Sequence, residues 1–323
     1  MLAAISTAHF SSINYPSGPA TGGAGSGLAT LCFLRWDEMQ LFTLERKKFR
    51  QLFTQHIHES GPESGPKLKL GQLALYLAGD EYPFLDTASY VNQLDELASQ
   101  VHEIADDSAN QRCLIDAVSQ VLFEQQGFCG VDVDRSDPEY HYLNRVLDTH
   151  TGIPITLSLV YLEVARRVGI QCSGIGLPGH FVVHLDELDL FLDPFRSGQL
   201  LSIADCRCLV RETVGSHLPW RDDFLMPCSD QDILFRLLNN LKTLYMQIED
   251  YSRAAEVLQS MVLINPSAHY LKRYLAWCYY NIHDHPTALR HLETYLQECW
   301  PCSNQSESKY QIESLWKAIG GLS

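Results

Sequence analysis

The stretch THTGIPITLSLVYLEVARRVGIQCSGIGLPGHFVVHLDELDLFLDPF, residues 149–195, decides the fold. Its first part has apolar residues at helical spacing, Pro154 suits the first helical position, where a missing N–H costs nothing, and Gly169 ends the pattern. Glu163 is expected on the outward face of this helix. The rest alternates short apolar segments with Gly, Pro and acidic turns, which predicts strands. A helix followed by a small antiparallel sheet is therefore expected over residues 131–229.

The N-terminal third contains no strand pattern. Residues 38–130 carry apolar residues at helical spacing in successive segments, which predicts an all-α cap. Residues 1–37 have no charged residue before Arg35 and include the run PSGPATGGAGSG, so they predict a disordered extension that cannot build a core.

The C-terminal segment, residues 230–323, contains an internal repeat. A shift of 34 residues aligns Tyr245 with Tyr279, Asp250 with Asp284, Ala254 with Ala288, Leu258 with Leu292 and Val262 with Leu296. This is the period of tetratricopeptide helical hairpins, although two ordinary amphipathic helix pairs could match in the same way. The repeat predicts a module that binds a protein or peptide. The predicted fold class is thus α+β, with an all-α N-terminal cap, a core with a small antiparallel sheet and C-terminal helical hairpins.

Composition narrows the possible partners. The 323 residues include 24 Lys and Arg against 39 Asp and Glu, a net charge of −15, which disfavours nucleic acid and membrane surfaces and favours basic or neutral peptides. No apolar run approaches the roughly 20 residues of a membrane span. The ten cysteines are scattered, as is typical of reduced thiols, and predict a cytoplasmic protein.

Two polar residues follow the central helix in a suggestive order. His180 opens one predicted strand and Asp193 closes the next. This order resembles the transglutaminase-like branch of the papain-fold enzymes, in which a Cys at a helix N-terminus is activated by a strand His that an Asp orients. Pro154 stands where that cysteine is expected. The resemblance implies that His180 and Asp193 lie within hydrogen-bonding reach of each other.

A closer resemblance rests on the motifs YLNRVLDTHTGIPITLSLVYLEVARRVGI, GIGLPGHFVVH and LDPFRSGQLLS. Together with DEYPFLD and the repeats, they resemble the SirB-type family over roughly residues 70–300. That resemblance implies a transglutaminase-like core joined to C-terminal tetratricopeptide repeats.

The missing cysteine leaves two functions open. The first is a non-catalytic scaffold or adaptor built on a degenerate transglutaminase-like core, and the missing thiol favours it. The second is a papain-like acyl-transfer enzyme that uses a hydroxyl nucleophile with His180 and Asp193. Ser158, one turn beyond Pro154, and Thr156, in the first turn, are the candidate hydroxyls.

Metal and cofactor sites are not predicted. His180 and His184 on one strand lack a compact third ligand, although Asp193 or Asp186 could be imagined in that place. The spacing of Cys206 and Cys208 is too tight for a usual zinc site.

Overall fold

The computed structural model describes residues 36–59, 69–105, 110–131 and 137–299. The chain divides into two compact units, Met1–Thr43 and Leu44–Ser323, and the second contains the core, the sheet and the helical hairpins. The predicted disordered extension, residues 1–37, lies outside the described residues except for its last two, which begin helix α2 (Trp36–Glu59).

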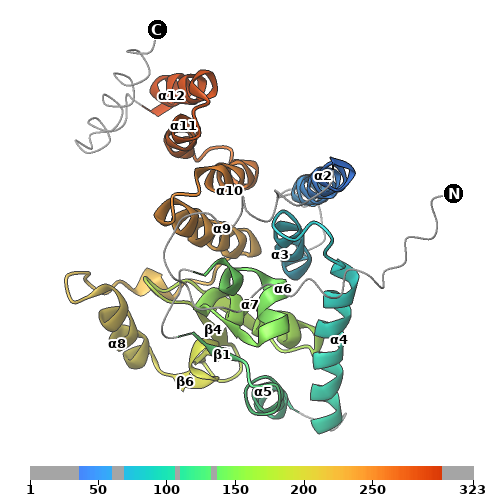
Figure 1. The fold of residues 1–323 in the computed structure, drawn as a ribbon. Coiled ribbons are helices and arrows are strands. Elements are labelled where there is room, and N and C mark those ends of the chain that lie inside the picture. Colours follow the sequence, from blue (N-terminus) through green and yellow to red (C-terminus); the bar gives the residue numbers. More distant parts are fainter. Residues whose placement is uncertain (1–35, 60–68, 106–109, 132–136, 300–323) are drawn as a thin grey trace, which may run out of the picture. The chain divides into compact units, whose positions relative to one another are not determined.

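Helix α7 (Pro154–Arg167) is the central element of the second unit, and Figure 1 shows it between the sheet, α4 and α9. Every residue from Pro154 to Ala165 is buried. The surrounding helices are α3 (Leu70–Gly79), α4 (Thr87–Ile104), α5 (Gln111–Ser119), which continues as a π-helical turn (Gln120–Gln125), and α6 (Leu143–Thr149). A short 3-10 helix, Pro138–His141, precedes α6.

The expectation that Glu163 faces solvent is wrong. Its side chain is buried, and its Oε1 accepts a hydrogen bond from the backbone N–H of Gly71 at 3.0 Å. Its Oε2 accepts from Arg167 at 2.7 Å. A Cβ added at Gly71 would lie 2.7 Å from the Glu163 Cδ, so this close approach of α3 to α7 requires glycine. The buried carboxylate is thus paired and hydrogen-bonded, as burial of a charge demands.

We expect Glu163→Ala to lower the free energy of unfolding by about 2–4 kcal/mol, because it leaves the buried Gly71 N–H without its acceptor and removes one of the two carboxylates that pair with Arg167, the other being Asp95. Chemical denaturation measures the change. Glu96→Ala, which removes an exposed glutamate from α4, is the matched control and should shift stability by less than about 0.5 kcal/mol. Equal stability of the two variants would contradict this role of Glu163.

The predicted combination of helices with a small antiparallel sheet is confirmed. Four strands pair antiparallel in chain order: β3 (Cys172–Ile175), β4 (Val182–Leu185), β5 (Leu190–Asp193) and β6 (Gln199–Leu201). A separate short parallel pair joins β1 (Cys129–Gly130) to β2 (Thr151–Gly152). The sequence did not predict β6 or α8 (Ile203–Val214), which covers a second apolar cluster that includes Val182 and Leu209. Two 3-10 turns, Pro194–Arg196 and Asp222–Leu225, complete this region.

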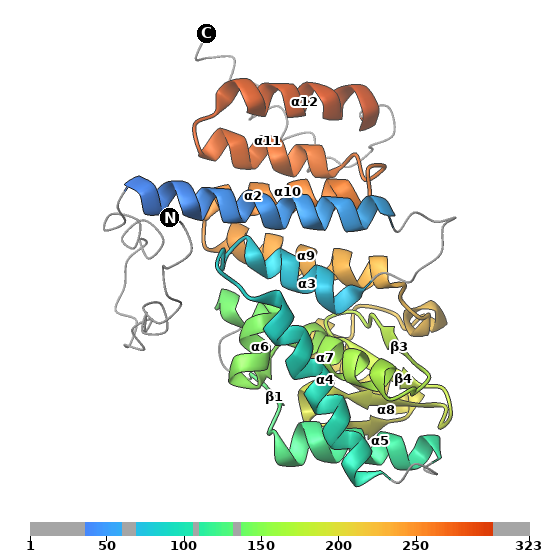
Figure 2. The ribbon, with the colours of Figure 1, turned by 90° about the vertical axis from the view of Figure 1, so that its right-hand side faces the viewer.

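The C-terminal segment folds into helices that lie side by side in chain order (Figure 2). They are α9 (Asp230–Gln247), α10 (Tyr251–Ile264), α11 (Leu271–Asn281) and α12 (His285–Cys299). The two hairpin turns repeat in detail. Glu249 and His283, 34 residues apart, have φ values of 60° and 64°, and the next residues, Asp250 and Asp284, both accept a hydrogen bond from the backbone N–H three positions on. The 34-residue period is therefore a repeat of hairpin geometry, while its assignment to the tetratricopeptide class stays a prediction.

Helices α9, α10 and α11 share one hydrophobic core with the preceding helices, because a single cluster runs from Phe49 to Cys278 across the expected boundaries at residues 130 and 229. Helix α12 packs on α11 through a separate cluster that includes Ala276 and Leu292. A buried hydrogen bond of 2.7 Å joins the hydroxyls of Tyr142 and Tyr245. At the edge of the same contact, Arg253 of α10 forms an ion pair with Glu81 at 2.7 Å.

None of the helices in the described ranges is long and apolar enough to cross a bilayer. The cytoplasmic location stays a prediction.

Candidate functional site

A tight turn places His180 inside the protein. Gly179 adopts a φ of 73°, and an added Cβ there would lie 2.7 Å from the Thr213 hydroxyl, so the turn requires glycine. The backbone N–H of His180 donates to the carbonyl of Leu177 at 3.1 Å, which closes the turn just before β4. The His180 residue is 3% exposed as a result.

Asp193, the last residue of β5, lies against this histidine. His180 Nε2 is 2.9 Å from Asp193 Oδ2 and 3.0 Å from Oδ1, and Asp193 is fully buried. The backbone N–H of Phe195 also donates to Oδ1, at 3.0 Å. Because the carboxylate accepts, Nε2 carries the proton that it donates, and the other ring nitrogen is the one left to act on a substrate. That atom, Nδ1, is buried and has no hydrogen-bond partner in the described part of the chain.

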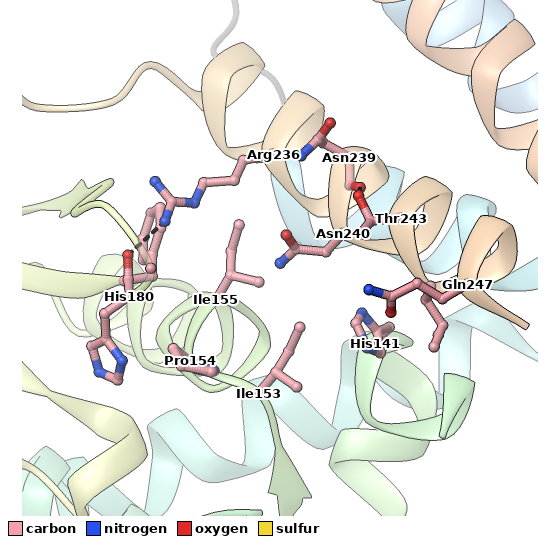
Figure 3. A pocket seen from close by; sticks show the side chains of 13 residues that line it. His141, Ile153, Pro154, Ile155, His180, Arg236, Asn239, Asn240, Thr243 and Gln247 are labelled. Carbon is pink, nitrogen blue, oxygen red and sulfur yellow. Dashed lines mark hydrogen bonds between the residues drawn. The ribbon is translucent and has the colours of Figure 1, made fainter. Parts of the chain in front are cut away.

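Pro154 begins α7 beside the His180 side chain (Figure 3). The hydroxyls proposed as substitutes for a thiol both bond to backbone. Thr156 Oγ1 accepts from the N–H of Ile153 at 3.1 Å and lies 3.0 Å from the Tyr140 carbonyl, so it caps the start of α7. Ser158 Oγ donates to the Phe181 carbonyl at 3.4 Å.

A cavity of about 580 Å³ opens between the start of α7 and α9. Figure 3 shows the two walls: Ile153, Pro154 and Ile155 on one side, and polar side chains of α9 on the other. The α9 residues that line it are Arg236, Asn239, Asn240, Thr243, Leu244 and Gln247. Sequence reasoning missed this wall. A signal was present, since Arg236, Asn240, Thr243 and Gln247 follow helical spacing and put a polar stripe on α9.

Comparison with known proteins gives the family. The family model of the transglutaminase-like superfamily matches residues 88–239. A UPF0162 protein of Xylella fastidiosa is 32% identical over 237 residues, which is 71% of this chain and 84% of the relative. This chain belongs to the UPF0162 family. The UPF0162 protein PA3419 of Pseudomonas aeruginosa is 31% identical over 61% of this chain and 72% of its own length. Mouse F-box only protein 21 is 33% identical over 33% of this chain and 19% of its own length. The SirB-type assignment made from the motifs stays a prediction.

Among the described residues, no cysteine lines the cavity beside His180. Burial raises the pKa of Cys172, of Cys206 and of Cys278 to about 12 each, so these thiols carry almost no thiolate at neutral pH.

The four residues considered as metal ligands form two separate pairs. His184 lies 3.1 Å from the exposed Asp186, whereas His180 pairs with the buried Asp193. Cys206 is buried and Cys208 exposed on the same helix. The described residues contain no group of three or more His, Cys, Asp or Glu that could hold a metal ion.

We expect Cys172, Cys206 and Cys278 to resist iodoacetamide at pH 8, because the raised pKa of each leaves little thiolate, and burial also blocks access to Cys206 and Cys278. The exposed Cys113, Cys129 and Cys208 serve as internal controls and should be alkylated. Mass spectrometry of the native protein after timed labelling measures both sets. Alkylation of Cys172 faster than of Cys113 would contradict the prediction.

We expect Asp193→Ala to lower the free energy of unfolding by about 2–4 kcal/mol, since it leaves buried His180 Nε2 and the Phe195 N–H without their acceptor. Asp186→Ala is the matched control, because it removes the partner of a histidine in an exposed pair worth about 0–1 kcal/mol. Chemical denaturation at pH 7 measures both. If the two variants unfold at the same denaturant concentration, the buried pair contributes nothing to the fold.

Proposed function

We propose that this UPF0162 protein is a non-catalytic interaction scaffold or adaptor, in which a transglutaminase-like core and C-terminal tetratricopeptide-like hairpins bind a protein or peptide segment. One observation carries the proposal. His180 and Asp193 have the arrangement of a base and its orienting carboxylate, yet the residue that begins α7 beside the His180 side chain is Pro154, which has neither a thiol nor a hydroxyl.

The chemistry of the missing group supports this proposal. Acyl transfer of the papain type needs a thiolate stabilised by the helix N-terminus and the imidazolium, and proline supplies no acidic hydrogen. A hydroxyl is a poor replacement, because its pKa is far higher than that of a thiol. The hydroxyls of Thr156 and Ser158 also donate hydrogen bonds to backbone carbonyls of this core.

A binding role suits the remaining features. The cavity next to Pro154 is bounded by α9, which is also the first helix of the hairpin unit, so one continuous surface joins the core to the hairpins. Stacked helical hairpins present extended surfaces to protein segments. The net charge of −15 disfavours nucleic acid as the partner.

We expect no turnover of labelled amide or peptide libraries, and no incorporation of a labelled amine into a glutamine peptide, above the rate of His180→Ala. Fluorescence and mass spectrometry measure both reactions. Pro154→Cys is the informative companion, because it restores a thiol beside His180 at some cost in stability from the freed first turn. Wild-type turnover that disappears in both His180→Ala and Ser158→Ala would overturn the scaffold proposal in favour of a hydroxyl-based enzyme.

A further inference from the structure

One cation in the cavity lacks a counter-charge. Arg236 of α9 donates through Nη2 to the carbonyls of Leu177 and His180, the latter at 2.7 Å, and its guanidinium lies 5.5 Å from the centre of the Phe181 ring. Carbonyl oxygens and an aromatic face leave the net charge of the guanidinium in place. Arg236 makes no ion pair within the described ranges, although the chain as a whole is strongly acidic. Burial lowers its pKa, the sign of a cation that has lost water without gaining an anion.

A second cation of α9, Lys242, lies outside the cavity lining and orients one of the lining residues. Lys242 is 9% exposed, lies 4.8 Å from the centre of the Tyr274 ring and makes no ion pair in the described part of the chain. Its Nζ donates to Asn239 Oδ1 at 2.8 Å. An ammonium can only donate, so this bond fixes the Asn239 amide with its oxygen toward Lys242 and leaves its NH₂ as a donor. The α9 wall therefore presents the Arg236 guanidinium together with further hydrogen-bond donors.

The remaining residues of the wall fit a peptide backbone. Arg236, Asn240, Thr243 and Gln247 form a stripe that spans about 16 Å along α9. That length equals about five residues of extended chain. Amide and hydroxyl side chains pair with backbone N–H and C=O groups, while Ile153, Pro154 and Ile155 offer an apolar wall to side chains opposite.

The geometry points to the ligand: we propose that the cavity between α7 and α9 binds the C-terminal end of an extended peptide, with its terminal carboxylate paired to Arg236. This inference rests on the proposed binding function and names its ligand class. The C-terminal carboxylate of a peptide is favoured over an acidic side chain in the middle of a peptide. The reason is that the stripe meets the turn Leu177–Phe181 at Arg236, which donates hydrogen bonds to the carbonyls of Leu177 and His180. A peptide that runs along α9 from Gln247 therefore ends there.

The local charge of the cavity reverses the expectation drawn from composition. Overall acidity favours basic or neutral peptides, yet Arg236, which makes no ion pair among the described residues, selects an anionic group at one end of the cavity. An Arg–carboxylate pair in a partly desolvated site is charge-assisted and geometrically specific.

The test measures how much of the full chain is retained on three randomised pentapeptide libraries, each immobilised on beads through the peptide N-termini. The first library has free C-terminal carboxylates, the second has C-terminal amides, and the third has C-terminal amides and one internal Glu. We expect the free-carboxylate library to retain the protein at least tenfold better than either amide library. Arg236→Gln should abolish this preference. Arg211→Gln, an exposed arginine of α8, is the matched control and should keep it.

A second set of variants guards against misfolding of Arg236→Gln, which thermal unfolding would reveal. Asn240→Ala and Gln247→Ala change the same stripe without touching Arg236, and each should weaken binding of a retained carboxylate peptide by about three- to tenfold. Equal retention of acid and amide peptides, retention only of internal-Glu peptides, no retention at all, or a preference unchanged in Arg236→Gln would each overturn the proposal. Binding without a preference for the carboxylate would leave the scaffold function standing, whereas only turnover would remove that function.

Discussion

Burial of α7 from Pro154 to Ala165 is the constraint on which the rest of this structure depends. A helical segment with no exposed residue must satisfy its polar groups internally, and Glu163 does so through Gly71 and Arg167. The ends of the helix are tied as well. Thr156 bonds to the Tyr140 carbonyl at the start, and Arg166 pairs with Asp230 at the beginning of α9. The start of α7 is thereby held at a defined place between the His180 turn and α9, whatever residue occupies position 154.

The contribution of the His180–Asp193 pair to stability does not depend on whether the core is catalytically active. The His180–Asp193 pair is buried, and removal of one partner of a buried pair costs far more than replacement of both by apolar groups. The pair is thus held by folding alone, with or without a nucleophile. The geometry of this pair therefore follows from folding and does not by itself indicate activity.

The sequence predicted those parts of the fold that local patterns encode. Pro154 and Gly169 marked the limits of the central helix, the Gly179 turn marked the approach to β4, and the 34-residue shift gave the paired turns at Glu249 and His283. The order of His180 and Asp193 led to the expectation of a contact that the structure contains. Periodicity failed for Glu163, because a pattern along one helix cannot show that neighbours cover its polar face too. The α9 stripe was missed for a related reason. Polar residues at helical spacing are typical of a solvated helix face, and only the structure shows that the start of α7 lies opposite them.

The shared use of α9 links the cavity to the hairpin unit. Its polar stripe forms one wall of the cavity, while Tyr245 on the same helix is buried and bonded to Tyr142 of the core. A chain cut before residue 230 would lose the cavity wall and part of the hydrophobic core together with the hairpins. Loss of a partner from such a fragment would therefore say nothing about which surface holds it. Single substitutions on the exposed edge of the stripe, at Thr243 or Gln247, change the cavity alone, because neither side chain belongs to the buried core that α9 shares with the rest of the chain.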